Sequence, residues 1–208
     1  MSLPSAPNPR VVSGYLQQWE QLENYRLQEQ SLSLLFKELC PANEVLEHIL
    51  LKVSALNDFY STNIFDTYSV AKHILSMKID QRLQSGDLSL VNELAKVILR
   101  EKPRNFYSFA SKYCSHHFPE KFPIYDSFVE KMLVHYDHAD RFSRFHKADL
   151  KHYELFVKVI KDFQSHYGLG RFTLRQIDIF LWLAGKDSFP RNYGGGTTAS
   201  PQGAHRSS

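Results

Sequence analysis

The sequence predicts an all-α fold, and three observations support that prediction. Apolar residues recur at spacings of three, four and seven through most of the chain. Val, Ile and Thr do not alternate with polar residues over any long stretch, and no Asn-Gly or Asp-Gly hairpin signal occurs. No internal repeat of fixed period is visible, which argues against a solenoid. A chain of 208 residues with 43% hydrophobic residues can form one compact multi-helix domain.

The helical patterns follow one another with short breaks. The first runs from Ser13 to Leu39 and stops at Cys40-Pro41, and the second begins near Ala42 and ends near Asn57. Further helices are expected at 64–78, 88–100, 106–117, 126–136, 149–166 and 173–184. The last of these begins with a capping box, because Thr173 precedes Gln176 by three positions. Its apolar stripe is expected to pack on the region of residue 126.

The two ends of the chain differ in composition from this helical body. Residues 1–12 are rich in Pro, Ser and Asn and are expected to form a flexible lead-in. Residues 191–208 have the Gly- and Ser-rich composition of a disordered tail. Residues 13–190 are expected to form a single helical domain.

Charge and cysteine content restrict the function only weakly. The formal net charge is +3, a basic bias that permits nucleic-acid binding without implying it. Cys40 and Cys114 have apolar neighbours and form no Cys-x-x-Cys pair, so buried free thiols are expected and neither a metal site nor another cofactor is predicted. No apolar run approaches the ~20 residues of a membrane span, and no hydrophobic leader is visible. We therefore expect a cytoplasmic protein without a membrane partner.

The segment 102–133 carries the strongest functional pattern. The residues KPRN at 102–105 predict a turn before a helix, and the residues FPIY at 122–125 bring Asp126 to the start of the next helix. Aspartate is a preferred N-cap, because its carboxylate accepts backbone N–H bonds at the positive end of the helix dipole. Asp126 is therefore interpreted either as a helix cap or as a catalytic carboxylate.

The order of these features resembles the helix-hairpin-helix DNA glycosylases of the endonuclease III superfamily. In that family a Gly-containing hairpin joins two helices and binds a DNA phosphate, and a catalytic Asp follows in a segment similar to residues 122–129 here. The resemblance covers residues 42–185 and is strongest over 102–133. It implies a compact helical fold of glycosylase type, duplex DNA as the partner in DNA repair, and Asp126 as the residue that assists hydrolysis of a base–sugar bond.

The resemblance also assigns roles to other residues. Both hairpin glycines of the family are absent, and Asn105 is expected to take the left-handed conformation that one of them would have taken. Ser108 stands where bifunctional members carry a Schiff-base lysine, so a monofunctional enzyme without lyase activity by that route is expected. The DNA-contacting candidates are Lys102, Arg104, Asn105, Ser108 and Lys112. The candidates for the base pocket or for a residue wedged into the DNA are Leu56, Asn57, Tyr60, Tyr107 and Tyr125, with Phe65 and Tyr68 as further aromatic candidates.

Plain structural interpretations compete with these roles. Lys112, the pair His116-His117 and Asp178 are each expected to be solvated, since charged and His side chains on helices are usually exposed. Loss of the hairpin glycines and of the lysine favours an alternative function, a non-catalytic helical module that binds DNA or a protein partner. A helical protein unrelated to DNA is a third possibility, and the sequence identifies no particular protein partner.

Overall fold

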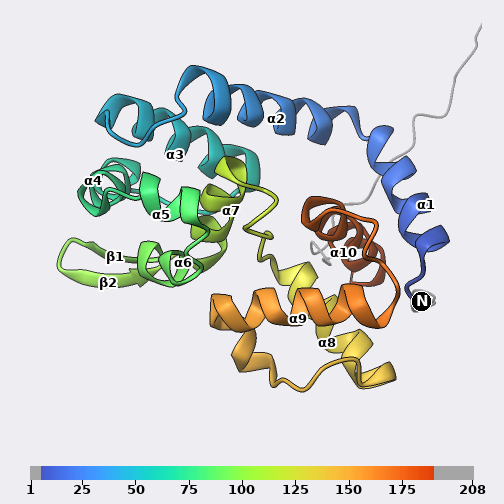
Figure 1. Ribbon diagram of the computed structural model, residues 1–208. Helices are drawn as coiled ribbons and strands as arrows, with labels where there is room; N and C mark the ends of the chain where they lie inside the picture. Colours follow the sequence, from blue (N-terminus) through green and yellow to red (C-terminus); the bar gives the residue numbers. More distant parts are fainter. Residues whose placement is uncertain (1–5, 190–208) are drawn as a thin grey trace, which may run out of the picture.

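The computed structural model describes residues 6–189 (Figure 1). Ten α-helices make up most of this part of the chain, and its one sheet is a two-stranded β-hairpin. The predicted class, a compact and predominantly helical domain, is confirmed.

The helices form two groups (Figure 1). One large hydrophobic cluster contains residues of both groups, and Trp19, Ile179 and Leu183 form a second, small cluster. The first group contains α2 (Glu23–Leu34), α3 (Leu46–Tyr60), α4 (Thr67–Met77), α5 (Asp80–Ser85), α6 (Ser89–Leu94) and α7 (Tyr107–His117). The second contains α1 (Pro9–Glu20), α8 (Ser127–Asp140), α9 (Tyr153–His166) and α10 (Leu174–Ser188). A π-helical turn, Leu35–Leu39, extends α2, and a 3-10 turn, Lys147–Lys151, precedes α9. The chain passes from the first group to the second between α7 and α8, so this connection lies where the groups meet.

The single helix predicted from Ser13 to Leu39 is two helices in the structure. The first, α1, begins at Pro9, where proline is well tolerated, and the Asn8 side chain accepts the N–H groups of the first turn. Val12 is fully buried, so the prediction of a flexible lead-in is wrong for residues 9–12. Residues 1–5 of that lead-in and the predicted tail at 191–208 lie outside the described residues.

The stretch from residue 96 to residue 105 is a β-hairpin, not the end of a helix followed by a turn. Strand β1 (Lys96–Leu99) pairs antiparallel with β2 (Lys102–Asn105). Arg100 and Glu101 connect them with φ angles of 47° and 62°, as a two-residue type I′ turn requires. Asn105 pairs with Lys96 in the ladder, so the prediction that Asn105 adopts a left-handed conformation is wrong.

Helix α10 packs against the start of α8 and fixes its position. A Cβ atom added to Gly185 would lie 2.7 Å from the Phe128 Cβ, so only glycine permits this approach of the two helices. The capping box predicted at the start of α10 is confirmed: the Thr173 hydroxyl accepts the Gln176 N–H at 3.2 Å, and the Gln176 side chain accepts the Thr173 N–H at 2.9 Å. The start of α8 is therefore a rigid part of the fold.

Three predictions from composition concern thiols, membranes and metals. Cys40 and Cys114 are both free and buried, as expected. Between residues 6 and 189, no helix is both long and apolar enough to cross a membrane. The same residues bring no three His, Cys, Asp or Glu side chains together in a way that could hold a metal ion.

Candidate functional site

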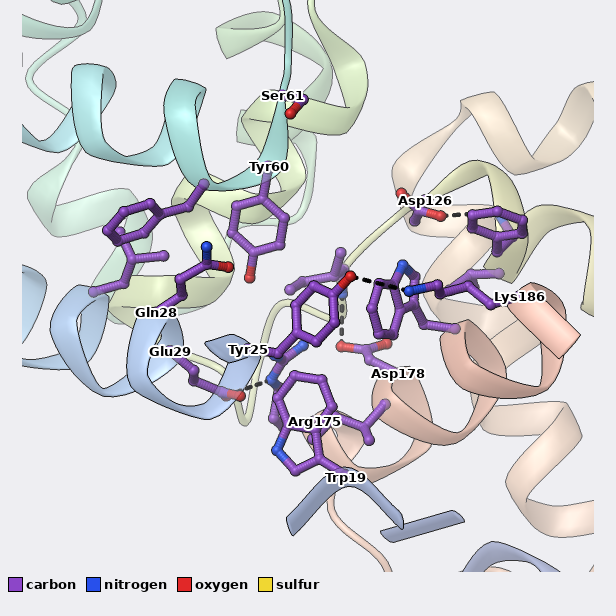
Figure 2. Close-up of a pocket in the computed structure, with 17 residues that line it drawn as sticks. Trp19, Tyr25, Gln28, Glu29, Tyr60, Ser61, Asp126, Arg175, Asp178 and Lys186 are labelled. Atoms are coloured by element: carbon purple, nitrogen blue, oxygen red, sulfur yellow. Dashed lines mark hydrogen bonds and ion pairs between the residues drawn. The ribbon is translucent and has the colours of Figure 1, made fainter. Parts of the chain in front are cut away.

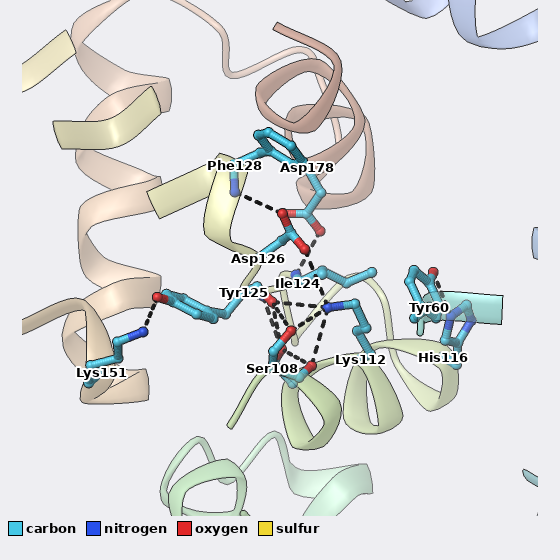
Figure 3. Close-up of polar contacts among 11 residues, drawn as sticks. Tyr60, Ser108, Lys112, His116, Ile124, Tyr125, Asp126, Phe128, Lys151 and Asp178 are labelled. Atoms are coloured by element: carbon cyan, nitrogen blue, oxygen red, sulfur yellow. Dashed lines mark hydrogen bonds and ion pairs between the residues drawn. The ribbon is translucent and has the colours of Figure 1, made fainter. Parts of the chain in front are cut away.

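Asp126 follows an extended segment whose backbone is held by buried side chains. The Ile124 N–H donates to the Asp178 carboxylate at 2.8 Å, and the Tyr125 N–H donates to the Ser111 hydroxyl at 3.1 Å (Figure 3). Such bonds from outside the segment replace the ladder bonds that an isolated extended chain lacks. They fix the direction in which the chain enters α8, and with it the position of Asp126.

The two carboxylate oxygens of Asp126 have different partners. Oδ1 accepts the Phe128 N–H at 2.8 Å, so the predicted N-cap is confirmed. Oδ2 lies 3.7 Å from Nζ of Lys112 on α7 (Figure 3). The Asp126 side chain is 21% exposed, so it can meet a ligand while it caps the helix. The structural and the functional interpretation of this residue are therefore compatible.

Lys112 is buried, with 3% of its surface exposed, and the prediction of a solvated charge is wrong. Its Nζ donates to the Ser108 hydroxyl and to the Tyr125 carbonyl, the latter at 3.4 Å. Burial lowers the pKa of Lys112, and the nearby Asp126 carboxylate opposes this shift. Lys112 is thus an amine with a lowered pKa beside a carboxylate.

Two cavities meet at Asp126. The α10 cavity, of about 510 Å³, lies between α10 and the α2–α3 side, and its walls include Trp19, Tyr25, Arg175, Asp178 and Trp182 (Figure 2). The α7 cavity, of about 390 Å³, lies at the start of α7, and its walls include Ser108, Lys112, Tyr125, Glu130 and Lys151. Tyr60, Ser61 and Asp126 line both cavities. A molecule bound in either cavity would therefore lie against the Asp126 carboxylate.

The α7 cavity brings together most of the predicted site residues. Its walls contain Tyr60, Asn105, Tyr107, Ser108, Lys112, Tyr125 and Asp126. Lys102 and Arg104 are exposed on β2 and line neither cavity. The predicted hairpin cations therefore do not line the cavity that contains Asp126, although Asn105 at the end of β2 does.

Leu56 and Asn57 are not placed to enter DNA. Leu56 is fully buried in the core. The Asn57 side chain holds the loop after α3, because its Oδ1 accepts the Ile64 N–H at 2.9 Å and the Thr62 hydroxyl at 2.8 Å. Their assignment as wedge residues is therefore wrong. The loop that Asn57 holds presents Phe65 with 99% of its surface exposed, so Phe65 is not a pocket residue either.

Tyr107 and Tyr125 form a buried wall of the α7 cavity. Their ring centroids lie 4.7 Å apart, and both residues are almost wholly covered. The Tyr125 hydroxyl donates to the Glu130 carboxylate, and the Lys151 Nζ lies 4.3 Å from the Tyr125 ring centroid. The Tyr125 ring therefore packs between the Tyr107 ring and the Lys151 amine in the wall of the α7 cavity.

His116 and His117 are buried, contrary to the prediction that they are solvated. His116 Nε2 lies 3.0 Å from the Tyr60 hydroxyl, and His117 Nε2 lies 3.4 Å from Nζ of Lys52. Burial lowers the pKa of His117 to about 3 and that of His116 well below its usual value. Both rings are therefore neutral near pH 7, and their contacts with Tyr60 and Lys52 join α7 to α3.

The α10 cavity was missed by the sequence analysis. Its polar and aromatic residues Arg175, Asp178 and Trp182 follow at steps of three and four on α10, so they share one face of that helix. This spacing in the sequence indicates a polar and aromatic helix face and could have identified the cavity wall. Asp178 was instead predicted to be an exposed acid, and that prediction is wrong because its side chain is buried beneath the segment at residue 124.

Comparison with known proteins defines the family of this chain. The family model HI_0787_N, described as an N-terminal domain, matches residues 11–121, and the chain belongs to this family. A relative in Haemophilus influenzae, named only as an uncharacterized protein, is 49% identical over 148 residues, which cover 71% of this chain and 71% of the relative. No solved structure matches the chain.

Proposed function

We propose that this protein is a DNA glycosylase of base-excision repair in which Asp126 assists cleavage of a base–sugar bond. One observation carries the proposal: the Asp126 oxygen that does not cap α8 is paired with the buried amine of Lys112 at the junction of two cavities. A carboxylate in a partly enclosed cleft stabilises positive charge that develops on a bound sugar. Because Oδ1 is fixed as the cap of α8, Oδ2 is oriented before any substrate arrives.

In the hydrolytic reaction, Asp126 acts as the base. Its carboxylate accepts a proton from a water molecule, and the water oxygen forms a bond to C1′ of the deoxyribose. The bond between C1′ and the base nitrogen breaks, and the base leaves with the electron pair. The proton that Asp126 accepted passes through solvent to the departing base, which regenerates the carboxylate. This is the chemistry that the resemblance to monofunctional helix-hairpin-helix glycosylases implies.

Exposed cations and one exposed aromatic residue support DNA as the partner. Lys96, Arg100, Lys102 and Arg104 are all exposed on the β1–β2 hairpin, where their side chains can contact phosphates without the close backbone approach that glycines would give. Phe65 lies on the loop that follows Ser61 and Thr62 at the α7 cavity. Apolar side chains that enter the base stack are common in proteins that distort duplex DNA, so we assign the wedge to Phe65.

A second chemistry is favoured by the burial of Lys112. A desolvated lysine with a lowered pKa is a better nucleophile than a solvated one. Attack of its amine would form an N–C1′ bond as the base leaves with the electron pair and takes up a proton. The nitrogen then loses a proton to solvent, the C1′–O4′ bond breaks with protonation of O4′, and an imine to the opened sugar remains, from which strand cleavage can follow. Ser108 occupies the position where the resemblance expects a lysine, but Lys112 lies one turn later and contacts the Ser108 hydroxyl. Both chemistries use Asp126 to stabilise charge.

The substitution Asp126→Asn tests the proposal, because it removes the charge and keeps the cap. Asn caps helices about as well as Asp, so the free energy of unfolding is expected to change by less than about 1 kcal/mol. Base release is expected to fall by about 10²-fold or more, since a preorganised charge-stabilising group is lost. Release is measured on duplexes that carry alkylated, oxidised or deaminated bases.

The matched control is Asp66→Asn. Asp66 is also an N-cap, on α4, and accepts the Ser69 N–H at 3.0 Å, but it lines neither cavity. This variant is expected to keep full activity. Release of no base by the wild-type protein, or full activity of Asp126→Asn, would refute catalysis and favour the non-catalytic binding module.

A further inference from the structure

The α10 cavity has an aromatic wall that contains both tryptophans of the chain (Figure 2). The rings of Trp19 and Tyr25 are stacked with centroids 6.1 Å apart, and Tyr25 meets Trp182 edge to face at 5.1 Å. The Lys186 Nζ lies 4.4 Å from the Trp182 ring centroid. Tyr25 and Trp182 are only partly buried, so a planar ligand can reach them from the cavity.

Asp178 contributes an unpaired polar atom to the same cavity. The residue is 2% exposed, and its Oδ2 accepts the Ile124 N–H at 2.8 Å. Its Oδ1 has no hydrogen-bond partner among the described residues. A buried polar atom without a partner costs roughly 1–3 kcal/mol, and a ligand that hydrogen-bonds to Oδ1 would remove this cost. Figure 2 places the carboxylate among the aromatic and charged side chains of the cavity.

Burial raises the pKa of Asp178 to about 8, so the carboxyl group gains or loses its proton close to neutral pH. Because Oδ2 is engaged by a backbone N–H, a proton would reside on Oδ1. This oxygen can therefore accept a hydrogen bond from a ligand N–H when ionised or donate one when protonated.

Arg175 supplies the complementary donors. Its Nε donates to the Glu29 carboxylate at 2.7 Å, which orients the guanidinium on the cavity wall. A guanidinium carries donors only, and its preferred partner among bases is the edge of guanine that presents O6 and N7 as two acceptors. Adenine has an amino group in place of O6 and is a poorer partner. Pyrimidines lack N7 and offer a smaller ring for stacking.

We propose that the α10 cavity binds a purine base of the 6-oxo class, stacked on one of the Tyr25 and Trp182 rings and in edge contact with the other, with its acceptor edge at Arg175 and a ring N–H at Asp178. The volume of about 510 Å³ is in the usual range for small-molecule sites. The inference deepens the proposed function and rests on it for the origin of the base, since Asp126 at the cavity wall would then face the sugar of an extruded nucleotide.

The two tryptophans provide a direct test that needs no catalysis. Guanosine, inosine, adenosine and uridine are titrated into the full-length protein while intrinsic tryptophan fluorescence is recorded. Guanosine and inosine are expected to quench the emission with Kd values at least about tenfold below those of adenosine and uridine, the difference that one good hydrogen-bonding pattern produces.

The substitution Asp178→Asn keeps an oxygen for the Ile124 N–H and replaces the free oxygen with an amide donor. It is expected to reduce the preference for guanosine by about tenfold, with thermal unfolding recorded to show that the variant folds. The control is Asp187→Asn on the same helix, because Asp187 is exposed and does not line the cavity. If Asp178→Asn does not fold, two other variants test the site. Trp182→Phe and Tyr25→Ala remove ring surface from the cavity wall and are expected to weaken guanosine binding.

The outcomes separate this inference from the proposed function. Equal quenching by uridine and guanosine, or an unchanged preference in Asp178→Asn, overturns the assignment of the cavity. If guanosine binds as expected but no duplex loses a base, the glycosylase proposal fails and the purine site stands. If base release depends on Asp126 but guanosine leaves the fluorescence unchanged, the glycosylase proposal stands and the purine site fails.

Discussion

Lys52 and Lys112 are both buried on helices, yet their surroundings differ in one decisive respect. Lys52 on α3 has no exposed surface, and its Nζ donates to the Cys40 carbonyl at 3.0 Å, the Ala42 carbonyl at 2.9 Å and Asn43 Oδ1 at 2.7 Å. An ammonium group has three donors, and here all three are used. Lys52 lines neither cavity, so its contacts indicate a structural role.

Lys112 on α7 also has three polar partners, but it lies beside a cavity from which a ligand can reach it. Its partners are the Ser108 hydroxyl, the Tyr125 carbonyl and the Asp126 carboxylate, and it lines the α7 cavity. Burial lowers the pKa of both lysines, that of Lys52 to about 8. A buried lysine with a lowered pKa therefore does not by itself mark a functional site. The cavity and the partly exposed carboxylate distinguish Lys112.

The largest expected effect is the difference in unfolding free energy between variants of the two lysines. Lys52→Met leaves the Cys40 and Ala42 carbonyl groups without the Lys52 donor and removes one of the two donors to Asn43 Oδ1, and it is expected to cost about 3–5 kcal/mol. Lys112→Met is expected to cost less than about 2 kcal/mol, because Asp126 is partly exposed and can turn to water. Denaturant unfolding of both variants measures the difference. Equal losses would show that the two lysines have the same structural role.

The pH dependence of stability tests whether His117, which lies beside Lys52, is buried from solvent and protons in the folded protein. His117 Nε2 lies 3.4 Å from Lys52 Nζ and 3.2 Å from Asn43 Nδ2, and the rings of Phe36 and Tyr113 cover it. Its pKa is lowered to about 3 in the folded protein, so the unfolded chain binds a proton first as the pH falls below about 6.5. The contribution of His117 is therefore fully present above pH 6.5 and is lost toward pH 3.

His117→Gln keeps an acceptor for the neighbouring donors and cannot titrate. Between pH 6.5 and pH 4 the wild-type protein is expected to lose about 3 kcal/mol more stability than this variant, at 1.36 kcal/mol for each pKa unit. The raised pKa of Asp178 acts in the opposite direction over this range, but it is present in both proteins and cancels in the difference. Parallel curves of unfolding free energy against pH would show that His117 is accessible to protons in the folded state.

Borohydride trapping on DNA with an abasic site tests whether Lys112 forms a covalent adduct with the sugar. The sequence predicts no covalent adduct, because Ser108 occupies the expected lysine position, whereas the burial of Lys112 beside Asp126 favours one. If Lys112 is the nucleophile, as in the second chemistry proposed above, the wild-type protein gives an adduct that falls by about 10²-fold in Lys112→Met and is unchanged in Lys161→Met, since Lys161 is exposed on α9. A wild-type protein that gives no adduct would leave water as the nucleophile.

Features with a local cause were predictable from the sequence. The position of Asp126 as an N-cap follows from the Pro-containing segment before it and the helical pattern after it, and the capping box of Thr173 has the same local origin. The burial of Lys112, His116 and Asp178 has a long-range cause. From Tyr107 to His117, α7 is covered on nearly all sides, so no polar face remains for the spacing rule to identify.

The β-hairpin was missed for a different reason. Its turn uses Arg100 and Glu101 at positive φ, where Asn and Gly are the usual residues, so the sequence contains no recognisable signal. The run Val97-Ile98-Leu99 has the composition of a strand, but it is too short to be told from the end of a helix. The positions of Lys102 and Arg104 on the surface therefore could not be derived before the strands were known.

The smallest expected effect concerns this hairpin, whose cations Lys102 and Arg104 line neither cavity. Lys102 and Arg104 are two positions apart on β2, so their side chains project from the same face of the ribbon and can contact neighbouring phosphates together. Changing both to Ala is expected to reduce the slope of log affinity against log salt by about two, since each phosphate contact contributes nearly one. The double variant Lys158→Ala, Lys161→Ala on α9 removes the same charge and is expected to keep the slope. If the two double variants change the slope equally, DNA is attracted by net charge alone and the hairpin is not its binding surface.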